Sequence, residues 1–139
     1  MATAPGTVAR QLVRSVLLAD APLRALVNGK VFTSHVSSTE AATLLQASSL
    51  IIVDVAGGFT RFFGQLADTS FSLWAYSKAS SYEAQDVYDK AFALLQMVQL
   101  QANDVDLIGS ARELERAEDG FNDELRAWYA RGRWTMKAL

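Results

Sequence analysis

The sequence has no cysteine, one histidine and two prolines among its 139 residues. Without cysteine the chain has neither a disulfide framework nor a thiolate nucleophile, so we expect a reducing, intracellular setting. Its apolar runs, such as residues 50–53, are far shorter than the ~20 residues that span a bilayer. The first residues also lack a basic and then apolar signal pattern. We therefore expect neither a membrane protein nor one secreted by that route.

Positive charge is scarce as well. Thirteen Lys and Arg against fifteen Asp and Glu give a net charge of −2, which offers no excess of cations to displace counterions from nucleic acid. Sequence-specific DNA binding is not expected. Half of the residues are hydrophobic and 20% are charged, which is typical of a folded globular protein. The length fits one domain over 1–139, with residues 1–6 loosely held.

Helical signals dominate the beginning of the chain. Apolar residues recur at helical spacing over 8–19, and Asp20 can cap a second, short helix that ends at Asn28-Gly29. β-Branched and aromatic residues then predict a strand over 31–36. Ser37 and Glu40 have the spacing of a capping box, so residues 39–46 form either a short helix or an ordered loop.

Two strands are predicted before the longest helix. The apolar run at 49–56, bounded by Gly57-Gly58, predicts a central strand covered on both faces. Residues 69–77 alternate, which places Phe71 and Leu73 on one face and Trp74 on the other. Between these strands, residues 59–64 are aromatic and end in glycine, as in either a strand or a mobile β-arm.

A long helix is predicted over 82–101, with Ser80 and Glu83 as its capping box and an apolar stripe along one side. Residues 107–118 have the composition of a helix, but a strand is needed there to lead into the alternating run 125–136. We predict a strand, a turn near 120–122 and a second strand. The element order predicts an α+β fold, in which an antiparallel-rich β-sheet packs against the long helix, with an N-terminal helical pair.

Residues that carry catalytic or metal chemistry are few. His35 lacks the motif that accompanies a hydrolytic nucleophile, so it receives no catalytic role. The calcium-loop spacing that begins at Asp104 fails at Ile108, which has no side-chain oxygen. Acidic residues over 113–119 alternate with arginines and indicate an exposed, charge-laced face. We predict no catalysis, no metal and no cofactor.

Aromatic residues and arginines mix near the end of the chain, at Arg126, Trp128, Tyr129, Arg131, Arg133 and Trp134. Such a mixture suits a platform for single-stranded nucleic acid, on which bases stack and arginines pair with phosphates. Aromatic residues and arginine are also enriched in protein interfaces. Because the total charge is acidic, packing or a protein interface is the favoured interpretation.

Residues 17–23 (LLADAPL) and 26–32 (LVNGKVF) resemble the opening of the bacteriophage tail-completion, or tail-terminator, family. A strand like 50–56, a strand ending in the pattern of 71–77 (FSLWAYS) and a helix like 82–95 follow in the family's order. The end of the chain, with its Arg-Ala-Trp-Tyr strand from Arg126, also matches in order and spacing. Residues 37–48 and 59–63 depart from the family pattern, the first because a shorter loop leading to a proline is expected there.

The resemblance implies a structural virion protein and not an enzyme. It implies a homo-oligomeric ring, commonly hexameric, at the head-proximal end of the tail tube, which terminates the tail and helps to join it to the head. The partners would be further copies of the chain, the tail tube protein and head–tail connector or adaptor proteins, with assembly in the host cytoplasm. Genomic DNA would pass through the ring.

Two alternatives remain open. The first is another neck component, such as a head-completion or connector-adaptor protein. The second is a small hydrolase or ligand-binding α+β domain, which requires an apolar pocket with converging polar groups.

The candidate residues for a subunit or tail-tube interface are Phe59, Arg61, Phe62, Phe63, Arg131, Arg133 and Trp134. The aromatic stretch 59–63 is too apolar for an ordinary exposed loop, and the glycines that bound it let a segment swing. It either packs into its own core or forms a β-arm that orders on assembly against a neighbouring subunit or the tube.

Overall fold

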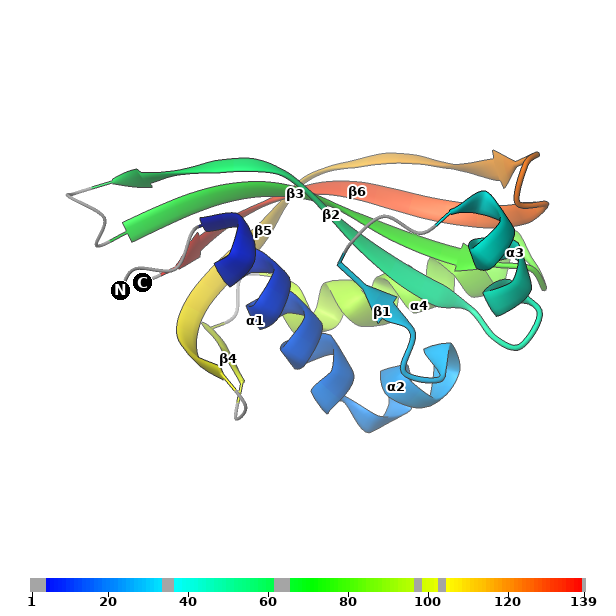
Figure 1. The fold of residues 1–139 in the computed structure, drawn as a ribbon, viewed down its shortest axis with the longest axis horizontal. Coiled ribbons are helices and arrows are strands. Elements are labelled where there is room, and N and C mark those ends of the chain that lie inside the picture. Colours follow the sequence, from blue (N-terminus) through cyan, green and yellow to red (C-terminus); the bar gives the residue numbers. More distant parts are fainter. Residues whose placement is uncertain (1–4, 34–36, 62–65, 97–98, 103–104, 139) are drawn as a thin grey trace.

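The computed structural model of the chain describes residues 5–33, 37–61, 66–96, 99–102 and 105–138. Over these residues the fold is α+β, with helices packed against a mixed sheet of six strands (Figure 1). The helices are α1 (Pro5–Ala19), α2 (Ala21–Val27), α3 (Ser38–Leu45) and α4 (Ser81–Leu95). The strands are β1 (Val31–Phe32), β2 (Leu50–Arg61), β3 (Leu66–Ser77), β4 (Gln99–Ala102), β5 (Val105–Asn122) and β6 (Ala127–Ala138). None of the described helices combines the length and apolarity needed to cross a membrane.

The predicted helix caps are confirmed. A carboxylate oxygen of Asp20 accepts a hydrogen bond from the Leu23 amide at 3.0 Å, and Asn28, whose φ of 51° is left-handed, is the C-cap that follows α2. The hydroxyl oxygen of Ser37 accepts a hydrogen bond from the Glu40 amide at 3.2 Å. The segment predicted to be either a short helix or an ordered loop is therefore the helix α3. Each cap satisfies an amide that lacks a partner in the first turn of its helix.

The sheet has the order β1-β2-β3-β6-β5-β4, and every neighbouring pair is antiparallel except β1 and β2. Helices α1, α2 and α4 cover one face, while α3 lies against the opposite face near one end (Figure 1). The alternation predicted for β3 is confirmed, because Phe71 and Leu73 lie in the larger core and Trp74 packs against the smaller one under α3.

Strand β2 is longer than predicted. It continues through Gly57-Gly58 to Arg61, with a bulge between Val55 and Gly57, so the prediction that these glycines end the strand is wrong. Glycine tolerates the irregular backbone of a bulge, after which pairing resumes. The strand alternative therefore holds for Phe59 to Arg61. Residues 62–64 lie outside the described residues.

Helix α4 is shorter than predicted, since it ends at Leu95 and residues 99–102 form β4. Gln96 has an extended backbone, and its side-chain oxygen accepts the Glu113 amide of β5 at 2.7 Å. A contact distant in sequence thus overrides helix propensity.

Strand β1 is shorter than the strand predicted over 31–36. It comprises only Val31–Phe32, and residues 34–36 lie outside the described part.

The strand predicted over 107–118 is confirmed as part of β5, which continues to Asn122. The turn falls at 123–126, beyond the position predicted for it, and β6 begins at Ala127. Asn122 explains the shift, because its side-chain oxygen accepts the amide of Leu125 at 2.9 Å and closes the turn.

Candidate subunit interface

The residues predicted for an interface fall into separate settings. Phe59 and Arg61 lie in β2, paired with Asp68 and Leu66 of β3. Phe62 and Phe63 lie outside the described residues. Arg131, Arg133 and Trp134 belong to β6, but the alternation of the strand divides them between the two faces of the sheet.

Trp134 belongs to the core and does not reach the surface. Its ring stacks on Phe71 with centroids 6.0 Å apart and meets the edge of Phe92 at 5.8 Å. Its indole nitrogen donates a hydrogen bond of 3.0 Å to the hydroxyl of Tyr88. With 0% of its surface exposed, Trp134 offers nothing to a neighbouring subunit, so its assignment as an interface residue is corrected.

A polar cluster surrounds Tyr88 where α4 crosses β5 and β6. The hydroxyl of Tyr88 donates to the carboxylate of Glu113, and the guanidinium carbon of Arg116 lies 3.9 Å from the centre of the Tyr88 ring. Burial raises the pKa of Tyr88, and the hydrogen bond to Glu113 adds to this shift. Glu113 therefore points into a packed site, and the prediction of a wholly exposed acidic face over 113–119 is corrected.

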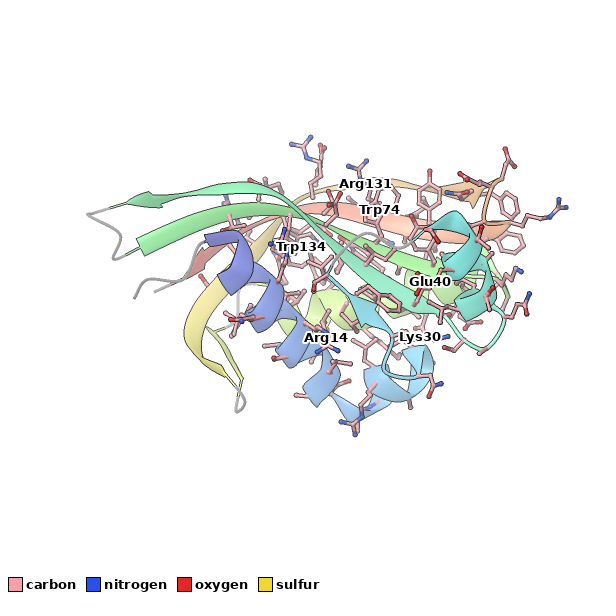
Figure 2. All side chains as sticks on the ribbon, in the orientation of Figure 1. Arg14, Lys30, Glu40, Trp74, Arg131 and Trp134 are labelled. Carbon is pink, nitrogen blue, oxygen red and sulfur yellow. The ribbon has the colours of Figure 1, made fainter. Side chains whose placement is uncertain are left out.

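The opposite side of the sheet, beyond the part that α3 covers, carries a second cluster on β3 and β6, which we call the open face. Its described side chains include Ser72, Trp74, Arg131 and Arg133, with Glu115 from β5. Figure 2 shows Trp74 and Arg131 together on this side and Trp134 between the sheet and the helices. The guanidinium carbon of Arg131 lies 4.6 Å from the centre of the Trp74 ring, in a cation–π arrangement.

Aromatic rings extend this cluster toward α3. Trp74 stacks on Tyr76 at 5.8 Å and meets Tyr129 at 5.5 Å. Burial and the neighbouring Tyr129 raise the pKa of Tyr76 to about 12, against the opposing effect of Arg131. These contacts hold Arg131 against an aromatic surface.

Arg133 has a different setting, because it is exposed and pairs with Glu115 at 3.1 Å across the open face. Both side chains are 55% exposed, and such pairs typically contribute only ~0–1 kcal/mol. Arg133 can exchange this partner for another at little cost. The less favoured interpretation, a nucleic-acid platform, would need Trp134 and Arg131 on one surface, but they lie on opposite faces of the sheet.

Two sheet edges are uncovered over much of their length. Strand β1 pairs with β2 only at Ile51 and Ile52, and β4 pairs with β5 only as far as Ser110. Beyond the bridge at Ala111, no other strand of the described part pairs with the outer side of β5. Leu114 and Phe121, exposed by 48% and 45%, lie on that stretch. An uncovered edge presents unpaired backbone donors and acceptors to a partner.

The residues considered for chemistry do not form a site within the described part. His35 and Asp104 lie outside it, and residues 105–109 belong to β5 instead of a calcium loop. No group of three or more His, Cys, Asp or Glu side chains among the described residues could hold a metal ion. A hollow of 310 Å³ beside α3 and α4 is lined partly by Ser49 and Glu83, which hydrogen bond to each other at 2.8 Å.

The sequence contains a signal for the open face. The alternation of β3 placed Trp74 opposite Phe71, and that of β6 placed Arg131 opposite Trp134, so the side carrying Trp74 and Arg131 follows once β3 and β6 are paired. The pairing itself joins residues that are far apart in the sequence, such as Trp74 and Arg131. Single-sequence patterns do not reveal such a pairing.

Comparison with known proteins gives a structural relationship only. No protein-family model and no curated protein matches the chain. A chain in a solved structure described as the virion of a native gene transfer agent particle is similar in fold, with a TM-score of 0.67 and 17% sequence identity. The match covers 93% of this chain and 92% of that one. The chain thus shares its fold, over nearly the whole of both sequences, with a chain of a virion particle.

Proposed function

We propose that this chain is a structural protein of a phage-type virion and acts as one domain over 1–139. It forms a homo-hexameric ring at the head-proximal end of the tail tube, terminates the tail and joins it to the head connector or adaptor. Its role is mechanical, without catalysis, metal or cofactor, and genomic DNA passes through the ring.

The observation that carries this proposal is the fold shared with a virion chain over nearly the full length of both sequences. The resemblance of residues 17–32 and 71–77 to the tail-completion family adds the position in the tail. Contacts between subunits can form at the uncovered edges of β2 and β5 and at the exposed side chain of Arg133.

Localisation in particles tests the position. Labelled chain is expected at the head–tail junction in several copies per particle, and particles made without it should have heads and tails that do not join. A single copy per particle, or label only at the far end of the tail, would refute the proposal. Label in the neck with tails of normal length and ends would instead indicate another neck component.

A surface variant tests the open face. Arg133→Ala removes a cation whose exposed ion pair contributes at most ~1 kcal/mol, so the isolated chain should remain folded. We expect loss of assembly into particles. Lys90→Ala is the matched control, because Lys90 is a partly exposed cation of α4 in an ion pair of 3.3 Å with Asp86. Equal assembly of both variants would remove Arg133 from the interface.

A further inference from the structure

Two short runs of regularly paired backbone, one toward each edge of the sheet, have no strand beside them on their outer side. In β2, the run 57–61 follows the bulge at Val55 and pairs regularly with β3 on its inner side. In β5, the run 118–122 follows the bulge at Arg116 and pairs regularly with β6. The two runs are equal in length, and no strand among the described residues pairs with their outer sides.

The sheet order fixes the relative direction of these runs. Strands β2, β3, β6 and β5 are joined by successive antiparallel pairs, so β2 and β5 run in opposite directions. A second copy of the chain, placed beside the first in the same orientation, sets its own β2 antiparallel to β5 of the first. Antiparallel pairing is slightly more stable per residue than parallel pairing.

We propose that run 118–122 of one copy pairs with run 57–61 of the next copy, so that a single sheet continues from subunit to subunit. The inference rests on the proposed function in one respect, that copies of the chain assemble side by side. Each copy uses two different edges, so the contact is heterologous and generates a ring when the rotation closes.

The residues of the two runs favour one register. One register places Arg61 at the position opposite Glu118, and residues of opposite charge at paired positions stabilise antiparallel strands. The same register places Gly58 opposite Phe121 and Gly120 opposite Phe59, while Gly57 lies opposite Asn122. An aromatic side chain across from a glycine covers backbone that the glycine leaves exposed.

The exposure of Phe121 supports the same edge. This side chain is 45% exposed in the isolated chain, although it packs edge-on against Trp128 with ring centres 5.0 Å apart. A strand added along 118–122 would remove part of that apolar surface from water, which favours the association.

The positions of the two runs also produce a stagger between neighbouring copies of the chain. Run 57–61 lies toward the end of the sheet where β2 and β3 project beyond α1, whereas run 118–122 lies toward the turn between β5 and β6 (Figure 1). Joining them shifts each copy along the strand direction relative to its neighbour. A closed sheet requires such a shift, because its strands tilt against the axis of closure.

Engineered disulfides test the register in a chain that has no cysteine of its own. Thr60 and Asp119 face each other across the proposed junction, where the Cα atoms of antiparallel partners lie ~4.5–5.5 Å apart, within reach of a disulfide. The double variant Thr60→Cys with Asp119→Cys is oxidised, both as purified protein at high concentration and in assembled particles. The off-register control is Asp54→Cys with Asp119→Cys, since Asp54 lies six positions earlier in β2.

We expect the Thr60/Asp119 variant to give a covalent series that rises from dimers to a closed ring, while the control and each single variant stay monomeric under denaturing conditions. Dimers from a single variant would mean that like edges meet, and would overturn the proposal. Equal cross-linking of the control, or no cross-linking in either the protein or the particle, would overturn it as well.

A charge exchange provides a second test that needs no new disulfide. Arg61→Glu should abolish oligomers measured by sedimentation, and adding Glu118→Arg should restore them. Failure of the restoration, with both variants folded by circular dichroism, contradicts the register. These assays need no information about location in the virion. Cross-linked rings from a chain absent from the head–tail junction would therefore refute the proposed function and leave the edge pairing intact.

Discussion

Among Gly29, Gly120 and Gly132, the glycines whose surroundings the structure describes, Gly132 has the least room for an added methyl group. A Cβ there would overlap the hydroxyl of Tyr88 and lie 2.7 Å from its Cζ and 3.0 Å from a carboxylate oxygen of Glu113. The Tyr88 side chain would have to move away from Trp134, whose buried N–H donates a hydrogen bond to the Tyr88 hydroxyl. A buried hydrogen-bond donor left without an acceptor lowers the free energy of unfolding by ~1–3 kcal/mol, and forced repacking of a core lowers it by a similar amount. Gly132→Ala should therefore destabilise the chain by about 2–5 kcal/mol.

A double-mutant cycle shows whether Tyr88 is the cause. Tyr88→Phe removes the overlapping oxygen, so Gly132→Ala should cost less in that background, with a coupling energy of ~1 kcal/mol or more. The free energies come from urea unfolding of the four proteins. Tyr82→Phe is the control for loss of a hydroxyl, because Tyr82 is 79% exposed. Additive effects within ~0.5 kcal/mol would refute the assigned contact.

The remaining predictions concern a cap, alkaline pH and the aromatic stretch. Ser80→Ala should lower unfolding free energy by ~1 kcal/mol, because Ser80 accepts the Glu83 amide at 3.0 Å, whereas Ser81→Ala next to it should not in the same urea assay. Tyr76 and Tyr88 have raised pKa values in the folded chain, to about 12 for Tyr76. As the pH rises, these tyrosines therefore lose their protons in the unfolded chain before they do in the folded chain. Above about pH 10, each of the two should lower the free energy of unfolding by up to ~1.4 kcal/mol for every pH unit. Urea titrations from pH 9 to 11.5 should show this fall, and a flat profile would contradict it. Phe62→Ser with Phe63→Ser should leave the melting temperature of the isolated chain unchanged and abolish ring formation, and an unfolded double variant would place these rings in the core.

Local interactions explain which features the sequence predicts well. The caps at Asp20, Ser37 and Ser80 involve atoms within a few residues, so the sequence contains the whole interaction. The face assignment of β3 is equally local, since alternation alone separates Phe71 from Trp74. The fold class then follows from the order of elements.

The errors lie where distant residues decide the local structure. Helix α4 ends early because the side chain of Gln96 accepts a hydrogen bond from the Glu113 amide, and residues 99–102 pair with β5 as strand β4. The sequence shows that Trp134 and Arg133 are neighbours in a strand, but not which of them the helices cover. That choice depends on α4 lying across β6, where Tyr88 meets Trp134. The interface assignment of Trp134 therefore could not be corrected from sequence patterns.

The bulges in β2 and β5 help to explain how a chain with two uncovered sheet edges avoids non-specific aggregation through these edges. They interrupt regular pairing at Val55, Glu113 and Arg116, so an incoming strand finds only short runs on either edge. Interrupted and charged edges are a common protection against edge-to-edge aggregation. A single short junction is weak, but a closed ring cannot lose one subunit without breaking two junctions. Edges that are too short to hold a pair of copies can thus hold a complete ring, and this favours assembly where several copies gather on a common surface such as the end of a tube.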